Sequence, residues 1–301
     1  MARIRSLARS RCLVTGASSG LGRALAIALA AEGADLVLTA RNRGRLDDVA
    51  ARIRSDFPNA PEPQVVVADL TDEADRLRLV DAVQDRRPAL DLLVNSAGVG
   101  ANGPFETHDP SVLRRIFDLN VVALAELCRL CLPMLARGAS PTILNLGSIV
   151  ARRGLPGRAA YSASKFAVAG FSESIRAEWA KYGIHVLLVN PGFTATEFEA
   201  NLLADTSRFK VTDRRTARAE DVAARAVRAL KQGKHELTLT GEGRLLLAVN
   251  RLAPRLVDLG FARWIRRLYP ETTAAESSAV PRPRIAEPRA VGYDFEHSSG
   301  D

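Results

Sequence analysis

A tyrosine and a lysine four residues apart, Tyr161 and Lys165, are the pair in this chain best suited to move a proton. On a helix this spacing stacks the phenol and the ammonium group one turn apart. An unperturbed tyrosine has a pKa of about 10, too high for easy proton transfer near neutral pH, but a nearby cation favours the phenolate and lowers that pKa. We therefore predict that Lys165 lowers the pKa of Tyr161 and that the two residues act together as an acid/base pair.

A glycine-rich run near the N-terminus predicts a binding site for a pyrophosphate. Gly16, Gly20 and Gly22 follow an apolar stretch of strand length and begin a stretch with helical periodicity, so the implied order is strand, turn, helix. One glycine would make the tight turn, one would let the pyrophosphate approach the backbone, and one would let the helix pack on the sheet. The spacing differs from the Gly-x-Gly-x-x-Gly fingerprint of the commoner dinucleotide folds.

Other polar and glycine residues stand at the ends of later apolar runs or in the helical stretches beside them. They are Asp69 and Leu70, Asn95 to Gly98, Asn120, Ser148, Pro191 and Gly192, and Thr196. Together with the glycine run and the Tyr161/Lys165 pair, they resemble the short-chain dehydrogenase/reductase (SDR) family over roughly residues 10–240. Ser96, where that family more often has asparagine, and Thr194, where it usually has an aliphatic residue, depart from the pattern.

The resemblance implies a nicotinamide cofactor and a set of residues that would bind it. These are Gly16, Ser18, Ser19, Gly20, Leu21, Asp69, Leu70, Asn95, Ala97, Gly98, Tyr161, Lys165, Pro191, Gly192, Phe193 and Thr196. The glycine turn would line the pyrophosphate and ribose, and Asp69 with Leu70 would flank the adenine. The residues after Asn95 would border the second ribose, and those from Pro191 to Thr196 would position the carboxamide.

By the same resemblance, four residues would carry the chemistry. Tyr161 would donate a proton to a carbonyl oxygen as the nicotinamide delivers hydride, or accept one in reverse. Ser148 would hydrogen-bond that oxygen, Lys165 would hold ribose hydroxyls and tune the tyrosine, and Asn120 would keep a water in the proton relay. The implied function is an oxidoreductase that interconverts a ketone or aldehyde and an alcohol. A catalytically weak NADP-binding regulator or scaffold is the alternative, although such a protein would most simply have lost one of these four residues.

The residue after the second apolar run favours NADP over NAD. An NAD site commonly places an acidic residue there to accept the ribose hydroxyls, whereas NADP needs a cation for its 2′-phosphate. Here the run 36–40 ends without an acid and Arg41 follows at once. A guanidinium can bind a phosphate through two charge-assisted hydrogen bonds, so we expect NADP(H). The alternative is that Arg41 is a solvated loop residue.

Composition excludes several other classes of function. The net charge of +8 comes from the ends of the chain, with four arginines in residues 1–11 and six in 244–270, and not from a basic face interleaved with aromatics, so we expect no nucleic-acid partner. The four histidines have no metal-ligand spacing, and no metal is predicted. Cys128 and Cys131 lie within a helical pattern and are interpreted as small core residues in a reducing compartment.

Apolar runs of strand length alternate with helical periodicity along the chain, which predicts an α/β fold with a doubly wound parallel sheet of the Rossmann type, about seven strands and helices on both faces. Strands are expected near 11–15, 35–39, 64–68, 91–95, 142–147, 185–190 and 236–240. Helices are expected near 20–32, 43–55, 73–86, 111–136, 159–182 and 219–232. We divide the chain into a catalytic domain (1–243), a helical extension (244–270) and a disordered tail (271–301).

The segment after Pro191 and Gly192 would cover the substrate, by the resemblance. It extends from Phe193 to about Arg215 and offers an apolar pocket. The available side chains are Phe193, Phe198, Leu202, Leu203 and Phe209. A hydrophobic carbonyl or alcohol, either a small molecule or an acyl chain on a carrier protein, is therefore the expected substrate, and an NADP preference favours reduction.

The stretch from Arg244 to Leu268 has leucines and a valine at helical spacing with arginines among them, and Pro254 divides it into two predicted helices. Such a pattern is typical of a helix on an anionic membrane surface, but equally of one packed on the domain, on a second subunit or over the substrate mouth. No secretory signal or membrane-crossing run is evident. We expect a cytoplasmic protein, with peripheral membrane contact through 244–270 as one alternative, that forms a homodimer or homotetramer.

Overall fold

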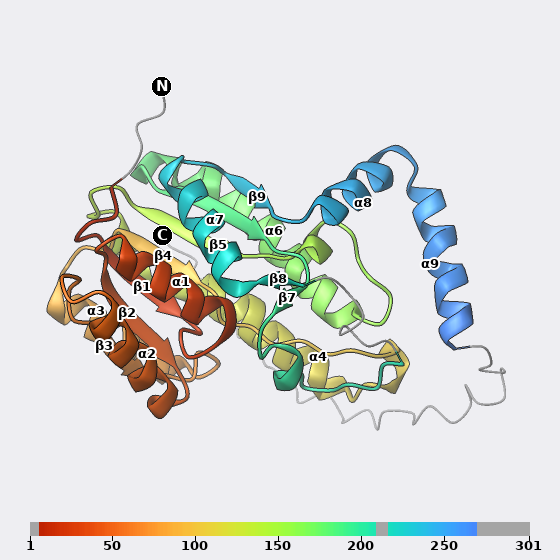
Figure 1. Cartoon of the computed structure of the whole chain (residues 1–301), viewed down its shortest axis with the longest axis horizontal. Coiled ribbons are helices and arrows are strands. Elements are labelled where there is room, and N and C mark those ends of the chain that lie inside the picture. The colour runs from red at the N-terminus through yellow and green to blue at the C-terminus, as the bar shows by residue number, and fades with distance from the viewer. Residues whose placement is uncertain (1–5, 209–215, 270–301) are drawn as a thin grey trace, which may run out of the picture.

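The computed structural model describes residues 6–208 and 216–269, and it contains the predicted doubly wound sheet (Figure 1). Its strands are β1 (Arg11–Thr15), β2 (Asp35–Ala40), β3 (Gln64–Val67), β4 (Leu92–Asn95), β5 (Thr142–Leu146), β6 (His185–Asn190) and β9 (Glu236–Thr238). They lie in the order β3-β2-β1-β4-β5-β6-β9, and every neighbouring pair is parallel. The strand order reverses direction between β1 and β4, which opens a crevice at the carboxyl ends of these strands.

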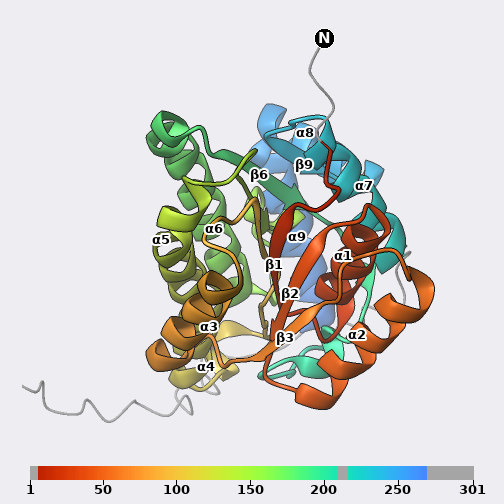
Figure 2. The same cartoon turned by 90° about the vertical axis from the view of Figure 1, so that its left-hand side faces the viewer.

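Helices cover both faces of the sheet (Figure 2). The main ones are α1 (Gly20–Ala31), α2 (Arg43–Asp56), α3 (Glu73–Arg86), α4 (Pro110–Phe117), α5 (Leu124–Leu135), α6 (Ala159–Glu178) and α7 (Ala219–Lys231). Side chains of α1, α2 and α7 form one buried cluster with the sheet, and side chains of α3, α5 and α6 form a second on the opposite face. The prediction of seven strands with helices on both faces is confirmed.

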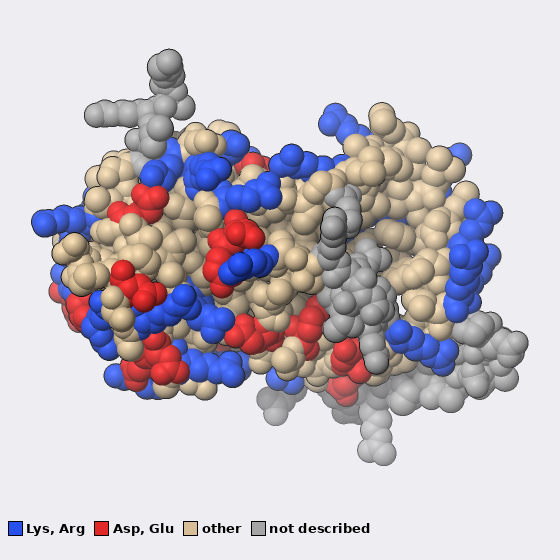
Figure 3. All heavy atoms as spheres, viewed as in Figure 1, with Lys and Arg blue, Asp and Glu red and all other residues tan. Residues whose placement is uncertain are grey.

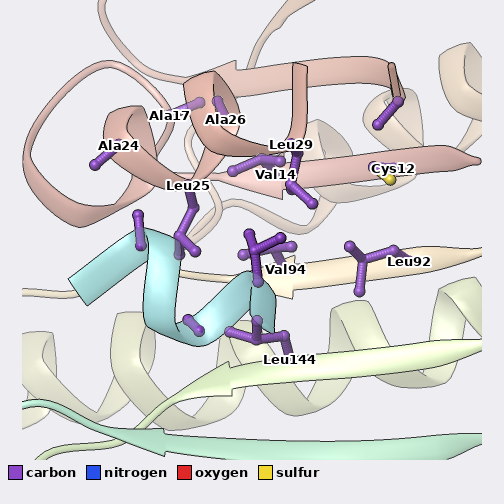
Figure 4. Close-up of a cluster of buried hydrophobic side chains, with 14 of the residues drawn as sticks. Cys12, Val14, Ala17, Ala24, Leu25, Ala26, Leu29, Leu92, Val94 and Leu144 are labelled. Carbon is purple, nitrogen blue, oxygen red and sulfur yellow. The ribbon is translucent and has the colours of Figure 1, made fainter. Parts of the chain in front are cut away.

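Strand β1 shows how the sequence supplies both cores. Cys12 and Val14 point into the cluster with α1 and α7, whereas Leu13 between them points into the cluster with α3 and α5. All three side chains are fully buried, which is why the strand reads as a continuous apolar run and not as an alternation. Figure 4 shows the first cluster, where side chains of β1 and α1 lie toward Val94 and Leu144 of the neighbouring strands.

One predicted helix is wrong in detail. The stretch 111–136 is not a continuous α-helix, because a π-helical turn, η2 (Asp118–Ala123), separates α4 from α5. The side chain of Asn120 in this turn is buried and hydrogen-bonds both backbone groups of Val99: its Oδ1 accepts from the amide and its Nδ2 donates to the carbonyl, each at 2.9 Å. Wider turns of this kind often occur at functional sites, and apolar periodicity does not reveal them.

Several short elements complete the body of the molecule. They are η1 (Phe105–Thr107), η3 (Ile149–Ala151), η4 (Trp179–Tyr182), η5 (Glu199–Asn201), β7 (Thr194–Ala195) and β8 (Ala217–Arg218). The sequence did not predict the β7–β8 ladder, which attaches the start of the segment after β6 to the residues before α7. Gly183 ends η4 in the left-handed region at φ +68°, a conformation that glycine adopts without strain.

Two further helices form an arm at one end of the molecule, away from the sheet (Figure 1). They are α8 (Gly241–Leu252) and α9 (Pro254–Leu268), and Pro254 is the first residue of α9, where the missing amide hydrogen costs no helical bond. Over the described parts of the chain, none of the helices combines the length and the apolarity that a membrane crossing requires. The predicted tail from residue 271 lies outside the described residues.

Candidate active site

A cavity of about 680 Å³ lies at the carboxyl ends of the strands. Among the predicted site residues, those that line it are Gly16, Ser18, Ser19, Gly20, Leu21, Arg41, Asp69, Leu70, Ala97, Gly98, Ser148, Tyr161, Lys165, Pro191, Gly192, Phe193 and Thr196. Residues from six segments that follow β1 to β6, and from helix α6, therefore meet in one place. Two predicted residues, Asn95 and Asn120, are not among those that line the cavity.

The glycine turn between β1 and α1 is packed too closely for side chains. Gly16 has a φ of +63°, and a Cβ added to it would lie 2.9 Å from the Cα of Ala97 in the turn after β4. A Cβ on Gly22 would lie 2.1 Å from the carbonyl oxygen of Gly16. Both contacts are with backbone that cannot move aside, so these two positions require glycine. The turn after β1 and the turn after β4 are thereby held against each other at the floor of the cavity.

The N-terminus of α1 binds an anion in this structure, and that anion is a side chain of the protein itself. The backbone amide of Gly20 donates to Oε2 of Glu197 at 3.0 Å, and the other carboxylate oxygen lies 3.3 Å from the guanidinium of Arg23. No acidic residue stands in the first turn of α1, and Ser19 makes no side-chain cap. A helix N-terminus with free amides favours negative charge, so this carboxylate occupies the kind of position that a phosphate oxygen would take.

Tyr161 and Lys165 lie one turn apart in the first half of α6, as predicted. The Nζ of Lys165 donates to the carbonyl oxygen of Leu146 at the end of β5, at 2.7 Å, and lies 5.7 Å from the centre of the Tyr161 ring. Ser148 caps η3 through its Oγ, which accepts from the amide of Val150 at 3.3 Å. The three side chains come from α6 and from the end of β5, and all three face the same cavity.

The predicted direction of the Tyr161 pKa is wrong for this structure. Burial raises the pKa of Tyr161 to about 12, while the charge of Arg158 and a hydrogen bond with Ser148 oppose the rise and Glu199 adds to it. Burial also lowers the pKa of Lys165 to about 8. The Lys165 ammonium is itself disfavoured by burial and donates to the Leu146 carbonyl. Arg158 is the cation with the largest lowering effect on the tyrosine pKa.

Arg158 and Glu199 are cavity residues that the sequence did not single out. One guanidinium nitrogen of Arg158 lies 2.7 Å from Oε1 of Glu199, and the other carboxylate oxygen accepts from Asn102 at 2.8 Å. Arg158 also lies over the ring of Phe193, 5.3 Å from its centre. Arg158 stands only three residues before Tyr161, so the sequence could have indicated that it lies near the site. Nothing in the sequence pairs it with Glu199. Asn42 and Arg45, which also line the cavity beside Arg41, were missed as well.

The apolar lining of the cavity differs from the one that the sequence predicted. Phe193 and Phe198 line the cavity, and the ring of Phe198 lies 5.3 Å from that of Tyr161, centre to centre. Leu202 and Leu203 are not among the lining residues. Leu203 instead packs against a small buried cluster around Ile116. Phe209 lies outside the described residues. The result is a mixed surface, in which two aromatic rings stand beside the Arg158–Glu199 ion pair.

Comparison with known proteins decides the family. The family model described as short chain dehydrogenase matches residues 10–207. This chain is a short-chain dehydrogenase/reductase. It is 31% identical over 252 residues to the dehydrogenase/reductase SDR family member 7B of Xenopus laevis, which covers 81% of this chain and 78% of that protein.

Two solved SDR structures have the same fold as this chain. One is a short-chain dehydrogenase from Sphingobium yanoikuyae in complex with NADPH, with a TM-score of 0.70, 28% identity, and coverage of 88% of this chain and 99% of that one. The other is a 3-ketoacyl-(acyl-carrier-protein) reductase from Brucella melitensis complexed with NADH, with a TM-score of 0.69, 27% identity, and coverage of 78% and 98%. The two complexes contain different nicotinamide cofactors.

In this SDR chain, the buried amides serve the packing of α6. Asn95 on β4 donates to Oδ1 of Asn145 on β5 at 2.8 Å and to the sulfur of Cys128 at 3.2 Å. Asn145 in turn donates to Oγ of Ser172 on α6 at 2.9 Å. Nearer the cavity, Asn120 donates to Oγ of Ser164 at 3.0 Å. These bonds hold α6 in one register against the sheet, and that register sets where Tyr161 and Lys165 point.

The cysteines of the SDR chain are core residues. Cys128 and Cys131 are buried in α5 among the apolar side chains of the second cluster, and burial raises the pKa of both thiols. This agrees with their interpretation as small core residues. Within residues 6–208 and 216–269, no three His, Cys, Asp or Glu side chains come together in a way that could hold a metal ion.

Replacement of Ser172 by alanine tests the role of the amide chain. The change leaves Nδ2 of the buried Asn145 without an acceptor, so we expect the free energy of unfolding to fall by ~1–3 kcal/mol in chemical denaturation. Ser174→Ala is the matched control, because this hydroxyl also bonds a carbonyl one turn back in α6 but is exposed. Its loss should cost at most ~0.5 kcal/mol. Equal losses in the two variants would contradict a special role for the buried chain.

Proposed function

We propose that this protein is an NADP(H)-dependent oxidoreductase that interconverts a ketone or aldehyde and an alcohol, with the proton supplied or taken up by Tyr161. The observation that carries the proposal is the meeting of Tyr161, Ser148 and Lys165 in the same cavity as the glycine turn after β1. The family supports it, and one of its solved members described above is a ketoacyl reductase.

The residues present fit a dinucleotide. The turn at Gly16 offers backbone with no side chain in the way, and the α1 N-terminus accepts a carboxylate, so a pyrophosphate suits the same place. The residues that would hold the cofactor are those predicted from the sequence that line the cavity. Asn95 is the exception, since its side chain is engaged with Asn145 and Cys128 below the cavity floor. Its contribution would be to the position of the turn that contains Ala97 and Gly98.

The cofactor, when bound, supplies or accepts a hydride at its nicotinamide ring. Tyr161, with a pKa of about 12, keeps its proton at neutral pH and is set to donate it to the oxygen of a carbonyl being reduced. Ser148, which hydrogen-bonds the phenol, would hold that oxygen beside it. Lys165, with a pKa of about 8, exchanges protons near neutral pH and lies one turn away. These residues would therefore protonate the product alkoxide and recover the proton from solvent.

Asn120 contributes by position in this proposal. Both hydrogens of its side-chain amide are used, one on the carbonyl of Val99 and one on Ser164, and its oxygen accepts from the amide of Val99. Ser164 in turn donates to the carbonyl oxygen of Tyr161 at 2.8 Å. The side chain thus links the turn after β4 to the turn of α6 that contains the tyrosine. The relay water expected at this residue stays a prediction.

The preference for NADP rests on arginines at the end of β2. Arg41 and Arg45 both line the cavity, and Asn42 between them caps α2 by accepting from the amide of Arg45 at 3.0 Å. Arg41 is 71% exposed and only loosely paired with Asp69, at 4.0 Å, so its guanidinium is free to turn toward a phosphate. No acidic residue stands at the end of β2, where it would accept hydrogen bonds from the ribose hydroxyls of NAD.

The proposed substrate is an apolar carbonyl or alcohol, either a small molecule or an acyl chain. Phe193 and Phe198 would contact its apolar part beside Tyr161. The alternative is a regulator or scaffold that binds NADP(H) without turnover. Purified protein that binds NADPH but oxidises it with none of a panel of apolar carbonyls, carrier-linked acyl substrates included, would favour that alternative. We also propose a homodimer or homotetramer, which sedimentation would test.

Tyr161→Phe tests the proton donor directly. The change removes only the hydroxyl, so we expect NADPH affinity to stay nearly the same while turnover falls by ~10²–10⁴, the usual loss for a general acid. Tyr182→Phe, at an exposed tyrosine outside the cavity, is the control and should leave turnover unchanged. Steady-state kinetics and cofactor titration measure both quantities. Normal turnover in Tyr161→Phe would refute the assignment.

Arg41→Asp tests the cofactor preference. The variant places a like charge near the 2′-phosphate while the glycine turn stays intact, so it should weaken NADPH binding far more than NADH binding. Arg43→Gln is the neighbouring control, because Arg43 pairs with Asp47 at 3.0 Å and does not line the cavity. Calorimetric titration with both cofactors measures the difference. Equal weakening of the two by Arg41→Asp would mean that this arginine does not recognise the phosphate.

The Arg158–Glu199 pair should set the pH dependence of alcohol oxidation, which needs the phenolate of Tyr161. Glu199 raises the tyrosine pKa and Arg158 lowers it. In the pH range where kcat/KM for oxidation rises with pH, Glu199→Gln should therefore increase it and Arg158→Gln decrease it. Reduction at neutral pH, which uses the protonated phenol already present, should respond much less. Arg152→Gln, which breaks ion pairs with Glu173 and Glu236, is the control. Shifts of the same sign in both variants would contradict this account.

A further inference from the structure

The arm formed by α8 and α9 exposes large apolar side chains on its outer side. Leu245, Val249 and Leu252 stand at positions i, i+4 and i+7 of α8, which places them on one side of that helix, and Leu252 is 86% exposed. Leu256 and Leu259 continue the exposed apolar surface in the first turns of α9, at 66% and 53%. The patch therefore spans the elbow at which the two helices meet.

Arginines surround this patch. Arg251 and Arg255 stand on either side of the elbow and are exposed. Arg263, Arg266 and Arg267 follow along α9, also exposed. Figure 3 shows positive side chains along the outer edge of α9, with no acidic side chain beside them in that view. Asp258 is the only acidic residue in the stretch 244–269, and it is paired with Arg153 of the body.

The inner side of the arm is already occupied by the body. Arg153, on the loop after η3, donates to Oδ1 of Asn250 at 3.0 Å, pairs with Asp258 and lies over the ring of Phe261 at 5.2 Å. At the far end of α9, the guanidinium of Arg208 donates to the carbonyl oxygen of Leu268 at 3.2 Å. The arm is thus fixed from both ends, and within residues 6–208 and 216–269 nothing covers the large apolar side chains of its outer side.

The charge on the arm decides which partner fits. Two copies of this chain that paired through this face about a two-fold axis would bring two positively charged surfaces together, which is repulsive. An anionic lipid bilayer offers apolar chains below and phosphates above, and both match this face. Long arginine side chains can keep their guanidinium groups among the phosphates while the leucines enter the acyl boundary. We propose that the outer face of α8 and α9 docks this protein onto an anionic lipid surface.

Docking at this face would bring the proposed catalytic cavity close to the lipid. The start of α8 packs beside the cavity, since a Cβ on Gly243 would lie 2.9 Å from the Cγ2 of Ile149, a residue that lines it. An apolar substrate dissolved in the bilayer would then have a short path to Tyr161. This consequence rests on the proposed function, whereas the docking itself does not.

The test uses the full chain and vesicles, and it needs no enzymatic activity. We expect the protein to sediment with vesicles of phosphatidylcholine containing phosphatidylglycerol at low salt, to be released by high salt, and to bind vesicles of phosphatidylcholine alone much more weakly. Leu252→Gln with Leu256→Gln should abolish sedimentation. Leu77→Gln, at an exposed leucine of α3 on the body, is the matched control and should sediment like the parent.

A second variant tests the charge without touching the apolar patch. Arg263, Arg266 and Arg267 are each replaced by glutamine. The partition onto anionic vesicles should fall by about 10²-fold, since each surface arginine contributes about a factor of five, and the salt dependence should weaken. Absence of vesicle binding in the intact protein, or equal binding to neutral and anionic vesicles, would overturn the proposal. So would leucine variants that keep vesicle binding but change the oligomeric state, which would make the face a subunit interface. Circular dichroism checks that each variant is folded.

Discussion

A short chain of buried amides fixes the geometry on which the site depends. Asn95 and Asn145 lie side by side on β4 and β5, and Asn145 donates in turn to the hydroxyl oxygen of Ser172 on α6. A polar group left without a partner in the core costs more than the hydrogen bond itself contributes, so α6 cannot slide or rotate without a penalty. Because Tyr161 and Lys165 stand on the same helix, the position of both reacting side chains follows from polar contacts two to three turns away in α6.

The same burial that positions these side chains changes their proton affinities in opposite directions. Burial lowers the pKa of Lys165 from 10.5 to about 8 and raises that of Tyr161 from 10.0 to about 12. Between pH 8 and 10.5 the unfolded lysine binds the proton that the folded one has lost, so this residue makes the protein more stable as the pH rises. Between pH 10 and 12 the folded tyrosine keeps a proton that the unfolded one loses, and stability falls. Near neutral pH the site therefore contains the protonated phenol of Tyr161 and a Lys165 ammonium group that burial destabilises.

The sequence predicts those parts of the structure that depend on local pattern. Parallel strands that are buried on both faces read as apolar runs, so the fold could be predicted. Gly16 and Gly22 mark a turn that no other residue fits, and all the predicted site residues except Asn95 and Asn120 line the cavity. The Arg158–Glu199 pair could not, because its partners are 41 residues apart and meet only when the segment after β6 folds over α6. The rise in the pKa of Tyr161 could not be predicted either, because the spacing of the two residues gives the distance to Lys165 but not how deeply the phenol is buried.

The segment after β6 connects the two ends of the cavity. Glu197 contacts the amide of Gly20 at the glycine turn, and Glu199, two residues later, contacts Arg158 near the tyrosine. A phosphate that takes the amide of Gly20 must displace the carboxylate of Glu197, since both are acceptors for the same hydrogen. Glu197 and Glu199 flank Phe198, whose ring lies 5.3 Å from that of Tyr161, so these three residues contact both the glycine turn and the surroundings of the proton donor. One short stretch of backbone thereby supplies side chains both to the glycine turn and to the electrostatic environment of Tyr161.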